Sequence, residues 1–133
     1  MDRLHPKLFD LVTSWDSDTE QPVVTEINLD AVARNRNQFD FLSVRKNGDW
    51  TECPGDDGVG FQRFRMIGAD RNRFRIEYQR NAGGTLTTAT RIECVVETRQ
   101  ILVAGRRDSI QVLRVVSIAA QEDEKRADEK HVR

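Results

Sequence analysis

The sequence predicts an α+β domain: a mainly antiparallel β meander with an N-terminal helix packed on the sheet. Apolar and polar residues alternate through much of residues 61–119 between clear turn signals, and an amphipathic helical stripe precedes them. A sheet with alternating faces buries one face and needs a cover, which this helix can supply. The alternative is that the long strands curl into a partly closed β-barrel.

The predicted helix spans residues 4–15. Apolar residues recur there at helical spacing, namely Leu4, Leu8, Leu11, Val12 and Trp15. Pro6 lies near the first turn, where its missing N–H group costs nothing. An acidic, turn-rich run at residues 16–20 ends the helix.

Residues 22–58 give weaker signals. Alternating β-branched residues favour a strand over 22–29, after which Asn28 or Asp30 could cap a helix running to about Phe41. Residues 47–49 predict a turn. Residues 52–58 contain three helix and strand breakers and predict a loop, which would expose Cys53.

The meander has a register that can be argued from its apolar residues. With residues 68–72 as the first hairpin loop, Phe64 faces Ile76 across the strands, and a one-residue slip would separate the apolar set. This register places Arg65 opposite Arg75. A three-residue turn at 82–84 would then place Arg91 opposite Arg75 as well.

The later strands follow the same logic. Residues 85–94 return as a strand, and the pair Val95-Val96 breaks the alternation, which predicts a bulge or a point where both faces are covered. The strand continues through 101–103, a turn follows at 105–108, and the last strand spans 110–119.

The chain is expected to form one globular domain over residues 1–121, followed by a disordered tail at 122–133 that is charged and lacks an apolar stripe. No apolar run resembles a signal peptide or a membrane span, so a cytoplasmic protein without membrane contact is expected. In that compartment Cys53 and Cys94 should stay reduced.

Charge is unevenly distributed although the net charge is only −1. Residues 1–58 hold 12 acidic and 6 basic side chains, whereas residues 59–114 hold 11 arginines against 5 acidic residues. Either the two halves neutralise each other within one fold, or a positive face is open to an anionic partner.

The inventory of reactive side chains argues against an enzyme. The histidines, His5 and His131, both lie in terminal segments, which removes most nucleophilic and metal mechanisms and leaves no predicted catalytic residue, metal site or cofactor. Residues 16–20 begin like a calcium loop but lack its later glycine and glutamate. Asp56 and Asp57 are better explained as a solvated turn.

The candidate site is an arginine-rich sheet face for an anion, formed by Arg63, Arg65, Arg73, Arg75 and Arg91. Opposed like charges cost stability, so either neighbouring carboxylates neutralise the row or a ligand offsets the cost. The strand aromatics Phe64, Phe74 and Tyr78 fall on the opposite face, and only Phe61 shares the arginine side, which weakens a nucleic-acid interpretation.

Together these observations favour a non-enzymatic binding or interaction domain. A nucleic acid or an acidic protein on the arginine face is one alternative for the partner. A small-molecule carrier is another, if the sheet encloses an apolar cavity. The sequence leaves the oligomeric state open.

Overall fold

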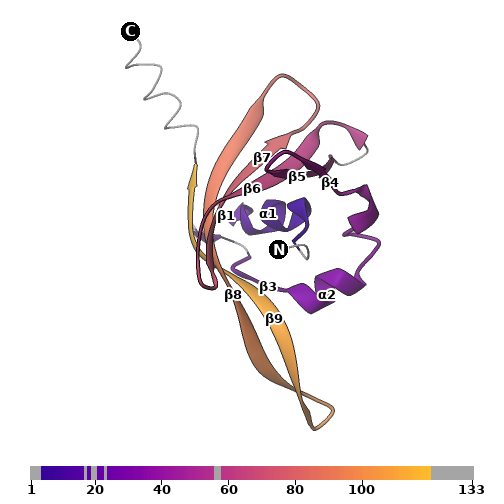
Figure 1. The fold of residues 1–133 in the computed structure, drawn as a ribbon, viewed down its shortest axis with the longest axis vertical. Coiled ribbons are helices and arrows are strands. Elements are labelled where there is room, and N and C mark those ends of the chain that lie inside the picture. The colour runs from indigo at the N-terminus through magenta and orange to yellow at the C-terminus, as the bar shows by residue number, and fades with distance from the viewer. Residues whose placement is uncertain (1–3, 17, 19–20, 23, 56–57, 121–133) are drawn as a thin grey trace.

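A curved, seven-stranded antiparallel sheet dominates the fold (Figure 1). The computed structural model describes residues 4–16, 18, 21–22, 24–55 and 58–120. Strand order is β3-β9-β8-β7-β6-β5-β4. The strands are β3 (Glu26–Asn28), β4 (Arg45–Asn47), β5 (Trp50–Pro54), β6 (Phe61–Asp70), β7 (Arg73–Asn81), β8 (Thr87–Val103) and β9 (Arg106–Ala120).

The sheet is open, because its edge strands β3 and β4 lie at opposite ends of the strand order. The predicted α+β meander is therefore confirmed, including continuous antiparallel pairing from β6 to β9. The barrel alternative is not favoured. Two short strands, β1 (Trp15–Asp16) and β2 (Gln21–Pro22), pair with each other outside this sheet. Among the described residues, no helix is long and apolar enough to cross a membrane.

Helix α1 (Pro6–Val12) lies inside the curve of the sheet and covers β5, β6 and β7, as predicted (Figure 1). Phe9 is fully buried, and its ring centroid lies 4.8 Å from that of Phe64 and 6.1 Å from that of Tyr78. The helix is shorter than predicted. The Thr13 hydroxyl donates to the carbonyl oxygens of Phe9 and Asp10, and Trp15 belongs to β1.

His5 is a core residue, although it lies near the start of the sequence. It is the N-cap of α1: its Nδ1 accepts from the Lys7 amide at 3.1 Å, and its Nε2 lies 3.1 Å from the Asp40 carbonyl oxygen. The ring is 1% exposed and packs edge-on against Phe39 and Phe41. These contacts fix the neutral tautomer and join the start of the chain to residues 39–41.

The segment before β4 is only partly as predicted. Of the predicted strand at 22–29, β3 occupies Glu26–Asn28. Asn28 caps helix α2 (Leu29–Arg34), its Oδ1 accepting from the amides of Asp30 and Ala31. The helix ends well before Phe41 because Asn35 leaves helical geometry and its side chain accepts from the Gln38 amide. A 3-10 turn, η1 (Phe41–Ser43), follows.

The predicted register of the first hairpin is wrong by two residues. Phe64 faces Tyr78, and Met66 faces Ile76. The connecting turn has two residues rather than five, with Arg71 at φ 58°. This would shift the register by three residues, and a bulge at residue 67 reduces the shift to two. A shift of two residues keeps every side chain on its predicted face but changes its neighbours.

The last hairpin contains a bulge, but on the other strand. Glu93 faces Ser117 and Cys94 faces Val115, so the extra residue is Val116 of β9 rather than Val95 or Val96 of β8. The turn between the two strands is Ala104-Gly105, both at positive φ. As a result β8 and β9 are longer than the strands expected on either side of a turn at 105–108.

The predicted exposed loop at 52–58 is partly wrong, because β5 extends to Pro54 and buries Cys53. Neither Cys53 nor Cys94 takes part in a disulfide. Burial raises the pKa of Cys94 to about 12, so this thiol is unreactive. Asp56, Asp57, Glu20 and the predicted disordered tail at 122–133 lie outside the described residues.

We expect His5 to make stability depend on pH. Burial lowers the pKa of His5 below its ordinary value of 6.5, so the unfolded chain binds more protons than the folded one just below that pH. The stability contributed by neutral His5 is complete above the unfolded pKa and is lost as pH falls through the folded pKa. Chemical denaturation between about pH 7 and about pH 5 should show this loss.

The matched variant is His5→Asn, which keeps an N-cap acceptor but cannot titrate. It should be less stable than wild type at neutral pH, because the ring packing is lost, yet its stability should depend less on pH over this range. Equal pH slopes for the two proteins would contradict the assignment.

Candidate anion-binding face

The face of β4–β8 that points away from α1, here named the outer face, carries all five predicted arginines. Phe64, Ile76 and Ile92 lie in the core, and the residues that alternate with them point outward. The charged residues of the outer face from β4 to Glu93 of β8 are Arg45, Glu52, Arg63, Arg65, Asp70, Arg73, Arg75, Glu77, Arg91 and Glu93.

The predicted row of opposed arginines does not form. Glu77 lies between Arg65 and Arg91 across the strands, while Arg75 lies between Gly68 and Glu93. The cause is turn length: the first hairpin turn has two residues, and the second, at 82–86, has five. The first turn is three residues shorter than predicted and the bulge at residue 67 restores one of them, whereas the second turn is two residues longer, so each register moves by two residues. The arginines therefore stay on the predicted face while carboxylates alternate with them.

Glu77 is the best-connected carboxylate of the outer face. Arg65 Nη2 lies 2.6 Å and Arg65 Nε 2.8 Å from Glu77 Oε1, and Gln79 Nε2 donates to Glu77 Oε2 at 3.1 Å. The Glu77 side chain is only 5% exposed, whereas that of Arg65 is 39% exposed. The carboxylate therefore lies beneath the guanidinium group, which is presented to solvent.

Two aromatic rings flank the guanidinium of Arg63. Its carbon Cζ lies 4.2 Å from the ring centroid of Trp50 and 4.9 Å from that of Phe61, and Arg65 Cζ lies 4.7 Å from Trp50. Arg63 also donates to Gln79 Oε1 through Nε and Nη2. Sequence reasoning missed Trp50 because it assigned no strand there. The Asn47-Gly48 turn signal before Trp50 could have placed a strand.

Arg75 occupies a site shaped by a glycine. A Cβ atom at Gly68 would lie 2.7 Å from Arg75 Nη2, so a larger residue there would displace the guanidinium, which now lies across β6. Arg75 is exposed and has no hydrogen-bond or ion-pair partner among the described residues. Its neighbour Arg73 pairs with Glu93 at 3.7 Å.

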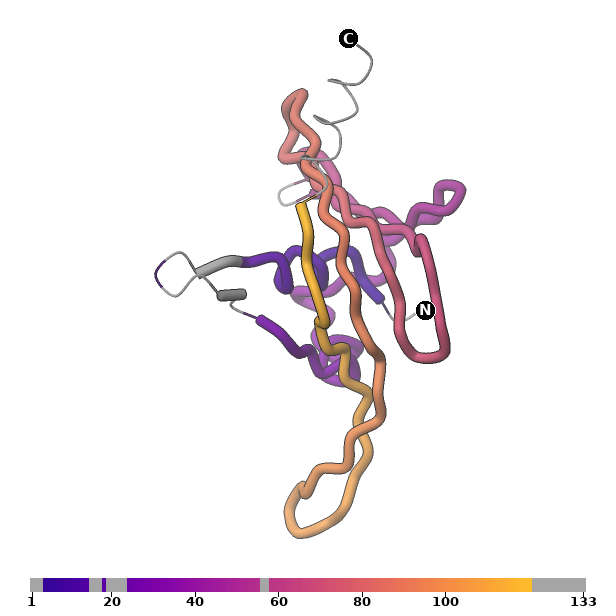
Figure 2. Tube along the Cα trace, turned by 90° about the vertical axis from the view of Figure 1, so that its left-hand side faces the viewer, coloured from indigo at the N-terminus to yellow at the C-terminus, as the bar shows by residue number. Residues whose placement is uncertain are grey.

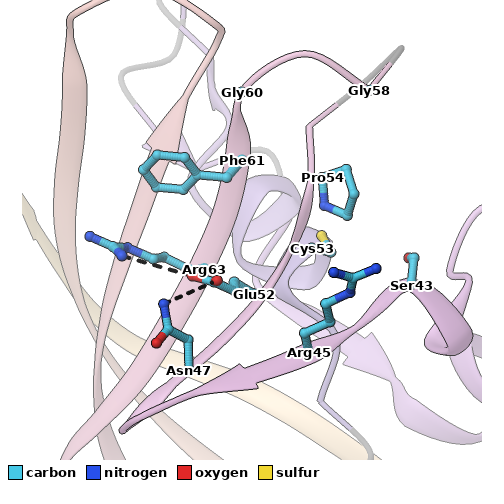
Figure 3. Close-up of a pocket in the computed structure, with 10 residues that line it drawn as sticks. All are labelled: Ser43, Arg45, Asn47, Glu52, Cys53, Pro54, Gly58, Gly60, Phe61 and Arg63. Atoms are coloured by element: carbon cyan, nitrogen blue, oxygen red, sulfur yellow. Dashed lines mark hydrogen bonds and ion pairs between the residues drawn. The ribbon is translucent and has the colours of Figure 1, made fainter.

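An open groove of about 570 Å³ runs along β4, β5 and the start of β6 (Figure 3). Arg45 lies on one side of β5, near Ser43 and Cys53, and Arg63 and Phe61 lie on the other. Glu52 lies 3.8 Å from Arg63 and accepts from the Asn47 amide at 3.3 Å. No described residue pairs with Arg45, so the groove presents an unpaired cation on the side of β5 opposite the Phe61 ring.

No reactive cluster accompanies these groups in the described part of the chain. There, no three His, Cys, Asp or Glu side chains gather as metal ligands. His5 is held by α1 and Asp40 on the other side of the sheet. What the outer face offers is guanidinium groups, which can hold an anion by charge and hydrogen bonds, and aromatic rings, on which planar groups can stack.

Comparison with known proteins identifies no relatives: no protein-family model matches the chain, and neither the curated proteins nor the solved structures yield a significant match.

Two arginine variants should separate structural from unpaired positions on the outer face. Arg65→Gln leaves Glu77 buried without its ion pair and should cost about 1–2 kcal/mol of unfolding free energy. Arg75→Gln removes no described hydrogen bond or ion pair and should change stability by less than about 0.5 kcal/mol. Chemical denaturation measures both. Equal losses in the two variants would show that Arg75 also has a structural role.

Proposed function

We propose that this chain is a non-enzymatic binding domain whose outer face binds single-stranded nucleic acid. The observation that carries the proposal is the arrangement of charge. From Arg45 to Glu93, six arginines and four acidic residues leave this face with a balance of two positive charges, on a chain of net charge −1. Such a local field attracts phosphate groups.

The exposure of the charged groups supports the same conclusion. Arg65 is far more exposed than Glu77, and Arg73 at 54% is more exposed than Glu93 at 28%. A ligand that approaches the sheet therefore meets guanidinium groups first. The recessed carboxylates hold these groups in place and reduce the entropy lost on binding.

The aromatic residues favour a nucleic acid over a simple anion. Phe61 and Trp50 share the outer face with Arg63, which supplies the combination of rings and guanidinium planes on which unpaired bases stack. Arg45 and Arg75, on either side of this cluster, are available for phosphate contacts. An open, nearly continuous sheet face suits an extended strand.

A carrier of small apolar molecules has less support. The concave side of the sheet, where such a cavity would lie, is filled by α1 with Leu8, Phe9 and Val12 fully buried. The open groove of about 570 Å³ lies on the opposite side, beside charged residues.

The test is fluorescence anisotropy with labelled oligouridine over a range of salt concentrations. Wild type should bind at low salt and lose affinity as salt rises. Arg75→Gln should weaken binding and reduce the slope of log K against log salt by about 0.7, the value for one phosphate contact to a single strand.

The matched control is Arg36→Gln, which removes the same charge from an exposed arginine in the turn after α2, away from the outer face. It should bind like wild type. Absence of binding at low salt, or equal effects of the two variants, would refute the proposal. Equal affinity for polyglutamate would show a general polyanion site instead of a nucleic-acid site.

A further inference from the structure

The last hairpin extends beyond the rest of the sheet as a two-stranded arm, residues 97–110 (Figure 2). The pairing of β7 with β8 ends at Val95, and the Val96 amide donates to the Asn72 carbonyl oxygen. On the other side, β3 pairs with β9 only at residues 112–114. Within the described chain, the strands of the arm therefore pair only with each other.

The base of the arm is fixed. Arg99 donates to both carboxylate oxygens of Glu26 in β3, at 2.7 and 3.0 Å, and to Glu97 at 2.9 Å. The end of the arm is different: Leu102 is 75% and Val103 51% exposed. A two-stranded ribbon is marginally stable in water, and exposed apolar strands favour association.

The two edges of the arm differ in charge. On β9 the edge carries Arg106, Arg107 and Asp108, none of which has an ion-pair partner among the described residues. On β8 the chain is uncharged from Gln100 to Gly105 and includes Ile101, Leu102 and Val103 in succession. Charged side chains protect strand edges from added strands, so the β9 edge is protected and the β8 edge is open to pairing.

We infer that the β8 edge of the arm pairs with the same edge of a second copy of this chain, antiparallel about a two-fold axis near Ile101. The two arms then form a four-stranded sheet of order β9-β8-β8-β9, above the size at which a small sheet becomes stable. Both outer edges of that sheet are the charged β9 edges. Association therefore stops at a dimer instead of continuing into a fibre.

A foreign strand is a less complete solution. A strand from a different protein would stabilise one arm, but its own far edge would not have to carry the charged residues that stop further strands from pairing. The symmetric register also avoids electrostatic conflict. It places Ile101 opposite its own counterpart, Gln100 opposite Leu102, and Arg99 opposite Val103, so no two charged strand residues oppose each other.

The experiment is sedimentation equilibrium of the full chain. Wild type should be a dimer. Ile101→Lys should be a monomer, because a symmetric pairing places the new ammonium group against its own copy. The control is Ile110→Lys, which changes a residue of similar exposure on the same face of the arm but on the protected strand, and it should remain a dimer.

Charge reversal makes the test specific. Ile101→Glu alone should also be monomeric, whereas an equimolar mixture of Ile101→Lys and Ile101→Glu should recover a dimer containing one copy of each. A monomeric wild type, a dimer that survives Ile101→Lys, or failure of the mixture to associate would each overturn the inference. Circular dichroism of each variant verifies that the domain is folded.

Discussion

The packing of α1 into the curve of the sheet is the interaction on which the rest of the structure depends. Phe9 contacts Phe64 and Tyr78, residues of two neighbouring strands, and so fixes which face of the meander is buried. Once that face is chosen, the alternation of the strands sends every second residue outward. The gathering of arginines on the outer face is thus a consequence of apolar packing on the inner one.

The alternation of apolar and polar residues predicted correctly which face of the sheet each side chain lies on, but not which residues are its neighbours across the strands. Arg65 and Arg75 lie on the predicted face, but the assumed loop lengths placed them side by side, and the real turns put Glu77 next to Arg65. Turn length depends on whether single residues such as Arg71 adopt positive φ, which composition does not determine. A site built from cross-strand pairs needs that detail, whereas the fold class does not.

Other differences have the same origin in tertiary context. The predicted strand at 85–94 includes Leu86, which is 72% exposed in the second turn, and the predicted helical stripe omits Phe9, which is fully buried. The sequence does not predict the arm. A strand pattern continues to the end of β8, and it does not reveal that β7 pairs with only the first part of that strand. The first explanation of the charge asymmetry, neutralisation between the two halves of the chain, holds in part. Arg63–Glu52, Arg80–Asp10 and Arg99–Glu26 join the halves, while Glu77 and Glu93 pair with arginines of their own half.

The separation of α1 from the strands that it covers also orders the steps of folding. Each hairpin of the meander joins residues close in the chain, whereas the contact of Tyr78 with Asp10 spans 68 positions. Closing so long a loop costs conformational entropy, which is offset only when the helix packs on the sheet. The surface on which the helix packs does not exist until β6 and β7 are paired. During synthesis the N-terminal segment therefore has to wait for its sheet. In that interval the inner faces of both elements are uncovered, which makes the nascent chain most prone to misassociation.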